Sequence, residues 1–392
     1  MNMLIKKSAG LILSCAILLF PLSGWSADTF KHPGMLSTSD DLARITAQVN
    51  QQSEPWFKGF QQLKLSLGWQ PRAVDIVYRG RNSEHSENYP QLYRDIAIAY
   101  SHALYWKATG NEAYAQSAVA ILNAWGGTLK EIRGSTDAAL AAGIYGYELA
   151  NTAEIMRDYP GWSASDFDTF KKMMETVFLP INLDFIARHN NTKIDHYWAN
   201  WDLAQLSSIM AIGILLDRKD LYDRAVDYYK NGEGNGAIGK LVWKLYPEQG
   251  MGQIQESGRD QAHSLLDIAL AGAICQMAWN QGDDLFGYDD NRLMKGAEYV
   301  AAYNLGKSVP YTTYTNSDVT QTQISESARG EVRAVWALIY NHYVVLKGLN
   351  SPNITEIATK IRPEGGPWSY GAYPGGFDQL GYGTLLFTLG EE

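Results

Sequence analysis

Hydrophobic residues recur at helical spacing along most of the chain. Between residues 92 and 109 they fall at i, i+3 and i+4, and Gly110 and Asn111 end the pattern. Period-two alternation is scarce, and Gly, Pro, Asn and Asp occupy the connections, as they do in helix–helix turns. The pattern therefore predicts an all-α protein with further helices at 112–125, 136–156, 165–187, 197–217, 221–230, 260–280, 291–305 and 329–346.

Paired helices without a strand-rich block favour an α/α toroid, in which helical hairpins surround a central cleft. The pairing follows from the number of helices and the short connections, because no exact sequence repeat is present. No linker-like segment divides the chain after residue 26, so residues 27–392 are expected to form a single domain. The stretches 232–239 and 312–327 are expected to be long loops, either lids over the cleft or ordinary surface loops.

The first residues have the pattern of a secretory signal. Lys6 and Lys7 precede an apolar run over 11–22, and small residues at 24 and 26 form a cleavage site after Ser26. No later stretch reaches the ~18 consecutive apolar residues of a membrane span. We therefore expect residues 1–26 to be a signal peptide. The protein is then periplasmic or secreted, with no membrane contact after cleavage.

Composition and charge narrow the classes of partner. Hydrophobic residues make up 46% and charged residues 19%, which is typical of a globular chain. The formal net charge of −9 argues against a nucleic-acid partner and a polybasic membrane surface. The 24 Tyr and 12 Trp residues suit a groove in which sugar rings stack, although large helical cores carry them too. The oligomeric state stays open.

No motif indicates a cofactor or a metal. None of the seven His residues forms HExxH or a comparable metal pair, and two Cys residues cannot build a Cys-based zinc site. Residues 234–240 (GNGAIGK) have the spacing of a phosphate loop, but Leu241 stands where Ser or Thr must hold magnesium. No GxSxG elbow is present. We expect chemistry without a cofactor.

One polar cluster lies at 190–202 (NNTKIDHYWANWD). His196 and Asn200 are four residues apart, so the predicted helix would place them on one face. Trp198 and Trp201 flank them. A structural role for each residue is the alternative.

Two further clusters lie on the following predicted helices. Arg259 and His263 are again four apart, at a helix start within ESGRDQAH. Arg292, Tyr299 and Tyr303 follow one face of the next helix. We expect the three clusters to meet in one cleft.

Asn, His, Tyr and Arg together suit abstraction of a proton α to a carboxylate. In a polyuronate, removal of the C5 proton places charge on the C6 carboxylate, which an amide and a guanidinium would stabilise. A His or Tyr removes the proton, and a Tyr or His returns one to the departing O4. The result is β-elimination, which cleaves the chain and leaves a 4,5-unsaturated uronate end.

The sequence resembles the alginate lyase superfamily of polysaccharide lyases, in particular its distant alginate and glucuronan lyase branch. The likeness covers roughly residues 80–310, and the order of the motifs carries it more than any one of them. The resemblance implies an α/α toroid and an anionic polysaccharide substrate: alginate, first its mannuronate-rich form, or glucuronan. The motifs are HPGMLST at 32–38, HYWANW at 196–201, ESGRDQAHS at 256–264, WNQGDDLFGYDDNRL at 279–293 and EYVAAYNLG at 298–306.

The sequence departs from that family at two places. The better-known alginate lyases have an Asn-His pair directly before the Tyr-Trp motif, where this chain has Asp195 and His196. They also have a catalytic Tyr about four residues after an Arg, where this chain has His263. His196 therefore stays an alternative base.

We expect Asn200 and Arg259 to neutralise the substrate carboxylate. His263 would be the base, because a neutral imidazole accepts a proton at neutral pH. Tyr299 or Tyr303 would then donate to O4, and a mechanism with Tyr in both roles is the alternative. The residues expected to bind substrate are Trp198, Trp201, Arg292, Gln261 and Glu256.

Two other functions remain open at this level. A glycoside hydrolase on the same toroid would need two carboxylates flanking a bond, and Asp202, Glu256 and Asp260 are available. Ion pairs to Arg259 or helix caps would equally explain these residues. A periplasmic glycan-binding protein would need the Trp and Tyr residues alone. The sequence does not separate mannuronate, guluronate and glucuronate, or endo from exo action.

Overall fold

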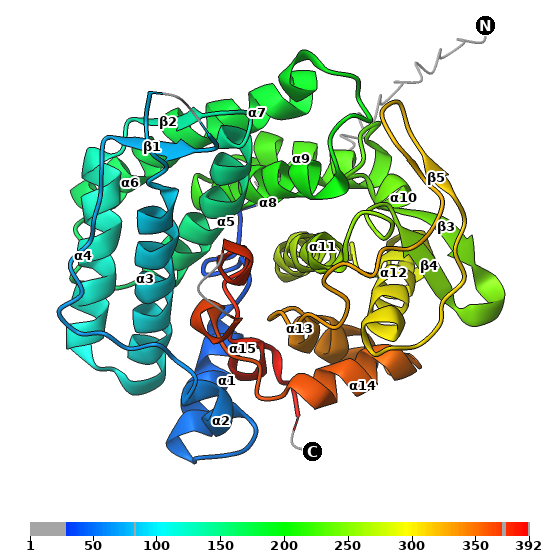
Figure 1. Ribbon diagram of the computed structural model, residues 1–392. Coiled ribbons are helices and arrows are strands. Elements are labelled where there is room, and N and C mark those ends of the chain that lie inside the picture. The colour runs from blue at the N-terminus through cyan, green and yellow to red at the C-terminus, as the bar shows by residue number, and fades with distance from the viewer. Residues whose placement is uncertain (1–28, 82–83, 371–373, 391–392) are drawn as a thin grey trace, which may run out of the picture.

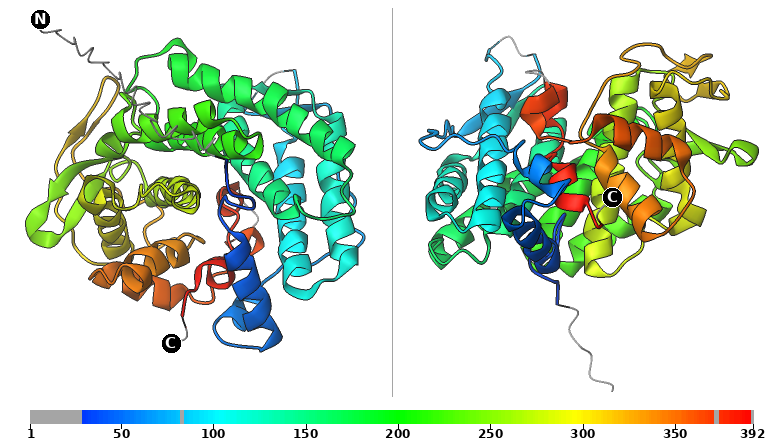
Figure 2. Two further views of the ribbon diagram at one scale, coloured as in Figure 1. Left: turned by 180° about the vertical axis from the view of Figure 1, so that it is seen from behind. Right: turned by 90° about the horizontal axis from the view of Figure 1, so that it is seen from below.

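The computed structural model describes residues 29–81, 84–370 and 374–390. The predicted signal peptide lies outside these residues. Helices wind in a ring around a central region, as Figures 1 and 2 show. The longer ones are α1 (Ser39–Asn50), α3 (Tyr89–Thr109), α4 (Glu112–Thr128), α5 (Ala138–Met156), α6 (Ala164–Met173), α7 (Leu179–Arg188), α8 (Ala199–Leu215), α9 (Lys219–Asn231), α11 (Gln261–Gln281), α12 (Tyr288–Asn304) and α14 (Pro352–Ile361).

Short helices and three two-stranded sheets complete the molecule. The short helices are α2 (Trp56–Phe60), α10 (Ile238–Leu241), α13 (Trp336–Tyr340) and α15 (Gly383–Phe387). The pair β1 (Ile76–Arg79) and β2 (Glu131–Gly134) is parallel. The antiparallel pairs are β3 (Val242–Tyr246) with β4 (Met251–Ile254), and β5 (Tyr314–Thr315) with β6 (Thr320–Gln321).

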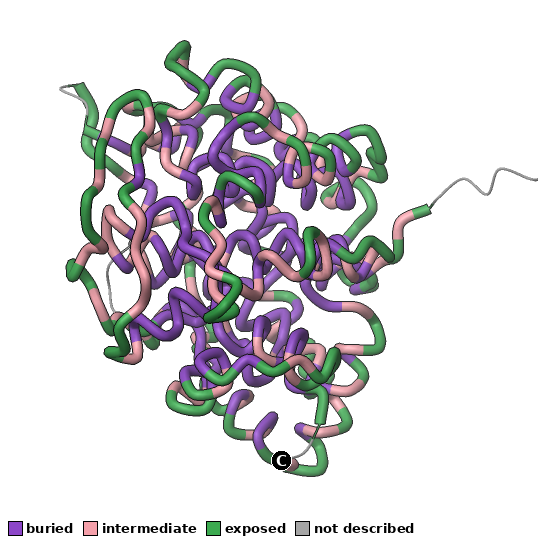
Figure 3. The backbone as a smooth tube through the Cα atoms, turned by 90° about the vertical axis from the view of Figure 1, so that its right-hand side faces the viewer, coloured by how far each residue is buried: buried purple, intermediate pink, exposed green. Residues whose placement is uncertain are grey.

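The helices form an inner and an outer layer. Every residue of α8 is buried, and α8 packs against α5, α9 and α11. A helix that is apolar on all sides must be covered on all sides, which places α8 inside. A Cβ at Gly146 of α5 would overlap Ser208 Oγ of α8, so the absence of a side chain allows this close approach. Figure 3 shows the buried residues inside the wall of the ring. The predicted α/α toroid is confirmed.

Two predicted helices differ from the structure. The segment predicted at 165–187 is divided into α6, a π-helical turn at Met174–Phe178, and α7. Pro180 lacks the N–H that a continuous helix would need. The helix predicted from 329 begins only at Trp336, because Ala328 and Gly330 have positive φ. No helix among the described residues is long and apolar enough to cross a bilayer.

Candidate functional site

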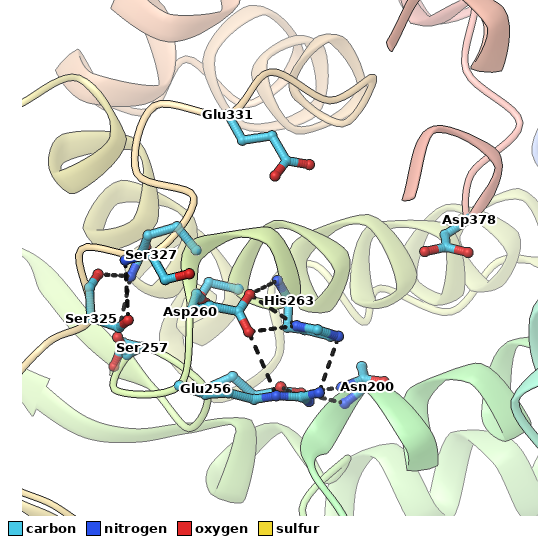
Figure 4. A network of polar contacts seen from close by, with 12 residues as sticks. Asn200, Glu256, Ser257, Asp260, His263, Ser325, Ser327, Glu331 and Asp378 are labelled. Carbon is cyan, nitrogen blue, oxygen red and sulfur yellow. Dashed lines mark hydrogen bonds and ion pairs between the residues drawn. The ribbon is translucent and has the colours of Figure 1, made fainter. Parts of the chain in front are cut away.

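A polar cluster lies where the N-terminal ends of α8 and α11 meet (Figure 4). Asn200 is the second residue of α8, and His263 is the third residue of α11. Glu256 and Arg259 belong to the turn that leads from β4 into α11. Because α8 packs against α11, residues about 60 positions apart in sequence come into hydrogen-bonding contact.

Glu256 connects Asn200 and Arg259 on the buried side of the cluster. Its side chain is fully buried, and its Oε1 accepts hydrogen bonds from Asn200 N at 2.9 Å and Asn200 Nδ2 at 2.5 Å. Its Oε2 accepts from Arg259 Nη1 at 2.7 Å. Glu256 is predicted to bind substrate, but both of its carboxylate oxygens already accept hydrogen bonds from Asn200 and Arg259, which favours a supporting role. Glu256 instead orients the amide and the guanidinium.

The hydrogen bonds of His263 define its tautomer. Arg259 Nη2 lies 3.1 Å from His263 Nε2, and a guanidinium can only donate, so Nε2 accepts. The other ring nitrogen, Nδ1, lies 2.7 Å from Asp260 Oδ2 and donates to it. The lone pair of His263 is therefore on Nε2, beside Arg259. The side chain is 37% exposed and can meet a ligand.

Asp260 supports His263 in two ways. It caps α11 by accepting from His263 N at 2.8 Å, and it accepts from the imidazole. Burial alone would raise the pKa of Asp260, but the bond from the His263 ring holds that pKa below its usual value. An ionised Asp260 would stabilise the imidazolium that forms when His263 takes up a proton.

A second acid lies behind Glu256. Asp267 stands on α11 one turn after His263, and it is fully buried. Burial, together with the neighbouring Glu256 carboxylate, raises the pKa of Asp267 well above its usual value. Among the described residues, both carboxyl oxygens of Asp267 are buried without a hydrogen-bond partner, and the raised pKa favours the uncharged, protonated form of this acid beside Glu256. Sequence analysis missed it, although the four-residue spacing from Arg259 to His263 continues to Asp267.

The C-terminal part of the chain supplies the opposite side of the site. Glu331 and Asp378 lie across from Asp260 and His263 in Figure 4. Asp378 is buried, and its Oδ2 lies 3.8 Å from Arg333 Nη1. Burial raises the pKa of Asp378, although neighbouring arginines oppose this. No sequence pattern singles out these residues, because loops without periodicity bring them here.

Two residues of the first predicted cluster lie outside the site. The helix α8 begins at Ala199, so His196 stands in the preceding turn and shares no helix face with Asn200. The His196 ring bonds to Asp318 of the 312–327 loop, with Nδ1 2.7 Å from Oδ2. Trp201 is 8% exposed and packs against Phe185, so the structure places it in the core rather than on an open surface where substrate would bind. Trp198 does join the site, because the Arg259 guanidinium lies 5.1 Å from its ring centre.

Arg292 and Gln261 have structural partners. Arg292 Nε donates to Val242 O at 2.8 Å, and its guanidinium pairs with Asp289. Gln261 is buried, and its Nε2 donates to the backbone carbonyls of Ser257 and Ser325. These contacts give both side chains structural roles in holding the hairpin and the 312–327 loop, and their predicted contact with substrate stays a prediction.

The predicted tyrosines are engaged elsewhere. Tyr299 donates to Pro310 O at 2.9 Å, and Tyr303 donates to Glu326 Oε1 at 2.7 Å. Burial raises the pKa of both phenols, that of Tyr303 to about 12.

A different tyrosine, in the predicted loop, is tied to the cluster. The Tyr314 hydroxyl accepts from Gln255 Nε2 at 3.0 Å, which leaves its own proton for another partner. Gln255 also binds the first residue of α8, since its Oε1 accepts from Ala199 N at 3.0 Å. Sequence analysis did not single out Tyr314, because only the folded chain brings its loop to α8.

Asp202 is a structural residue. It is buried, and it bonds to His189 Nε2 at 2.8 Å and to Tyr228 Oη at 2.9 Å. It also accepts from Gly236 N, so it fixes the 232–239 stretch under α8. These structural contacts account for Asp202, which a glycoside hydrolase would instead have used as a catalytic carboxylate. Within the described ranges, no group of three or more His, Cys, Asp or Glu residues could hold a metal ion.

Comparisons with known proteins agree with this architecture. No curated protein matches the sequence. Among solved structures, a variant of alginate lyase A1-III in complex with a tetrasaccharide has a TM-score of 0.63 at 14% identity, over 93% of this chain and 98% of that chain. Alginate lyase A1-III from Sphingomonas species A1 has a TM-score of 0.54 at 14% identity, over 83% and 91%. An alginate lyase from Bacteroides ovatus has a TM-score of 0.57 at 12% identity, over 92% and 100%.

At these identities the solved structures establish the shared fold alone. The family assignment comes from the sequence, since the family model described as "Alginate lyase" matches residues 40–309. This range includes both helix ends that carry Asn200, Arg259 and His263. The chain belongs to the alginate lyase family and is a polysaccharide lyase.

Proposed function

We propose that the protein cleaves a polyuronate by β-elimination at the cluster of Asn200, Arg259 and His263. One observation carries the proposal: a single buried carboxylate, Glu256, orients both an amide and a guanidinium beside an imidazole whose lone pair is on Nε2. C5 proton abstraction requires these groups. The amide and the guanidinium would stabilise the charge that develops on the carboxylate, and the imidazole would be the base.

The C6 carboxylate of the substrate would bind between Asn200 Nδ2 and the Arg259 guanidinium. Glu256 uses one N–H of the amide, so the other would serve the ligand once the site opens around Asn200, which is 2% exposed in the unbound protein. The guanidinium donates to Glu256 and His263, and a carboxylate would replace His263 as acceptor. Substrate binding would therefore free the His263 lone pair where the C5 proton arrives.

His263 Nε2 would take the C5 proton, and the C5–H electron pair would form the C4=C5 double bond as the C4–O4 bond breaks. The departing O4 needs a proton from an acid. We assign this role to Tyr314, because its hydroxyl accepts from Gln255 and so keeps its own proton for another partner. Tyr299 and Tyr303 are the alternatives, although their protons are donated to Pro310 and Glu326.

The proposed substrate is alginate, with its mannuronate-rich form first and glucuronan as the alternative. The family match and the solved alginate lyases of the same fold support an acidic polysaccharide. Export to the periplasm or medium, proposed from the signal-like residues 1–26, would place the protein where such polymers occur.

Ultraviolet absorbance tests the reaction directly, because only elimination creates the conjugated C4=C5 double bond. Polymannuronate, polyguluronate and glucuronan should each be incubated with the protein, and the products sized. We expect rising absorbance with at least one polymer. New reducing ends without absorbance would indicate hydrolysis and contradict the proposal.

A further inference from the structure

A loop remote from the catalytic cluster is held in one conformation by buried groups. Its backbone N–H groups at residues 64, 66 and 72 donate to Tyr382 Oη at 3.2 Å, His102 Nε2 at 3.0 Å and Asp95 Oδ2 at 2.8 Å. All three acceptors are fully buried. An irregular segment fixed at three points presents its side chains with little loss of entropy on binding.

Two exposed cations and one partly buried indole of this loop lie beside a second partly buried indole, Trp368, from the turn Pro367–Tyr370. The rings of Trp69 and Trp368 lie 6.3 Å apart at 72°. Arg72 lies 5.8 Å from the Trp69 ring centre, and Lys64 lies 6.0 Å from the Trp368 ring centre. Trp69 cannot rotate freely, because its Nε1 donates to buried Asp95 Oδ1 at 2.7 Å. We call Lys64, Trp69, Arg72 and Trp368 the tryptophan patch.

The tryptophan patch lies at the edge of the core, with its two indoles partly buried against the core and its two cations exposed. Lys64 and Arg72 are exposed, and Leu67 at the tip of the loop is 52% exposed. Among the residues that the structure describes, neither cation forms an ion pair with a carboxylate. The positive charge of Arg72 also acts on buried Asp95, where burial raises the pKa and Arg72 opposes that rise, so Lys64 is the freer of the two cations in this chain of net charge −9.

A row of aromatic rings connects the patch to the catalytic cluster. Trp368 lies 5.0 Å from Phe377, and Phe377 stacks on Tyr93 at 4.4 Å. The next residue, Asp378, lies across from His263 (Figure 4). Phe377 and Tyr93 are buried, so this row is an internal packing contact that joins the patch to the segment carrying Asp378.

We propose that the tryptophan patch is a second, non-catalytic binding site for acidic polysaccharide. The indoles would stack on pyranose rings, and Lys64 and Arg72 would pair with uronate carboxylates. A polymer bound there would have a raised effective concentration at the catalytic cluster. This inference rests on the proposed polyuronate substrate.

Charge reversal tests the site without touching the buried anchors. The double variant Lys64→Glu/Arg72→Glu should raise KM for long polymer on the order of tenfold, because the second contact is lost. Its kcat on tetrasaccharide should not change. The control is Lys172→Glu/Lys360→Glu, which makes the same change in net charge at exposed positions of α6 and α14. Equal KM values for the two double variants, or an equal fall in tetrasaccharide kcat, would overturn the proposal.

A binding measurement separates this site from the proposed reaction. Asn200→Ala, which should bind polymer without cleaving it, is run on a native gel containing polymannuronate, with and without the double reversal. We expect polymer to retard Asn200→Ala, and the reversal to remove most of that retardation relative to the control reversal. Unchanged retardation would refute the second site even if the lyase reaction is confirmed. A loss of retardation would support it even if wild-type protein gives no unsaturated product.

Discussion

Glu256 binds Asn200 and Arg259 through the two oxygens of one carboxylate, so these residues act as a unit. We predict that Asn200→Ala and Arg259→Ala each lower kcat by roughly 10²-fold, the usual scale for losing a donor at developing charge. The double variant should cost less than the product of the two effects, because the residues are coupled. Steady-state kinetics with folded variants measures this. If Asn200→Ala has unchanged turnover, Asn200 does not stabilise the substrate carboxylate.

The proton-transfer roles can be separated by four single variants. His263→Ala should lower kcat by at least ~10²-fold, the lower range for general acid–base catalysis. Tyr314→Phe should also lower it, since the phenol would lose the proton destined for O4. Tyr299→Phe and Tyr303→Phe should act mainly on stability, because their hydroxyls bond to Pro310 and Glu326. If His263→Ala stays active and one Tyr→Phe variant is inactive, that tyrosine has both roles.

Asp267 offers a residue-level test of how Glu256 is held. The raised pKa of Asp267 favours a protonated carboxyl, which would donate to the neighbouring Glu256, and the amide of Asp267→Asn would donate in the same way. We predict near wild-type kcat for Asp267→Asn. Asp267→Leu removes the donor and should lower kcat about tenfold with little change in KM, because Asn200 and Arg259 lose their orientation. Equal kcat in both variants, with circular dichroism showing a native fold, would argue against this coupling.

At the level of the elements, helical periodicity predicted where helices run better than where they begin. The prediction of α8 from residue 197 placed His196 on its face, but the helix begins at Ala199. Asn200, Arg259 and His263 were found because polar residues at helix starts interrupt an apolar pattern. Glu331 and Asp378 have no such signal, since their loops approach the site only through the tertiary fold.

The segment before α1 is tied to the ring by a titratable contact. His32 Nδ1 lies 2.6 Å from Glu154 Oε1, and its Nε2 lies 2.9 Å from Asp217 Oδ1. Burial would lower the pKa of His32, but the two carboxylates raise it above 6.5. Because the folded state binds this proton more tightly, the stabilisation is present below pH 6.5 and is lost as pH rises through the folded pKa.

We therefore predict that the Tm falls as the pH rises through and above neutrality. His32→Gln should flatten that dependence, since glutamine keeps hydrogen bonding but does not titrate in this range. Thermal unfolding across this pH range, for both proteins in one buffer series, measures the difference. Parallel curves for wild type and His32→Gln would show that another group controls the dependence.

At the level of the whole molecule, the toroid was predictable because each inner helix must bury all its faces. The composition of its centre was not, since residues from α8, α11 and the C-terminal segment converge only when the ring closes. The same closure gives a chain of net charge −9 the site that we propose binds a polyanion. On this proposal, the acidic protein as a whole repels the polyanion at long range, while the cationic side chains of the site attract it at short range.

These two forces respond differently to salt. The Debye length falls from about 30 Å at 0.01 M to about 8 Å at 0.15 M, so moderate salt screens the repulsion from distant acidic groups first. Higher salt then weakens the direct contacts of carboxylates with Arg259, Lys64 and Arg72. We predict that kcat/KM on long polymer passes through a maximum as NaCl increases. The Lys64→Glu/Arg72→Glu variant should need more salt to reach its maximum, because it adds repulsion. A steady fall of kcat/KM from the lowest salt would mean that local attraction dominates at all distances.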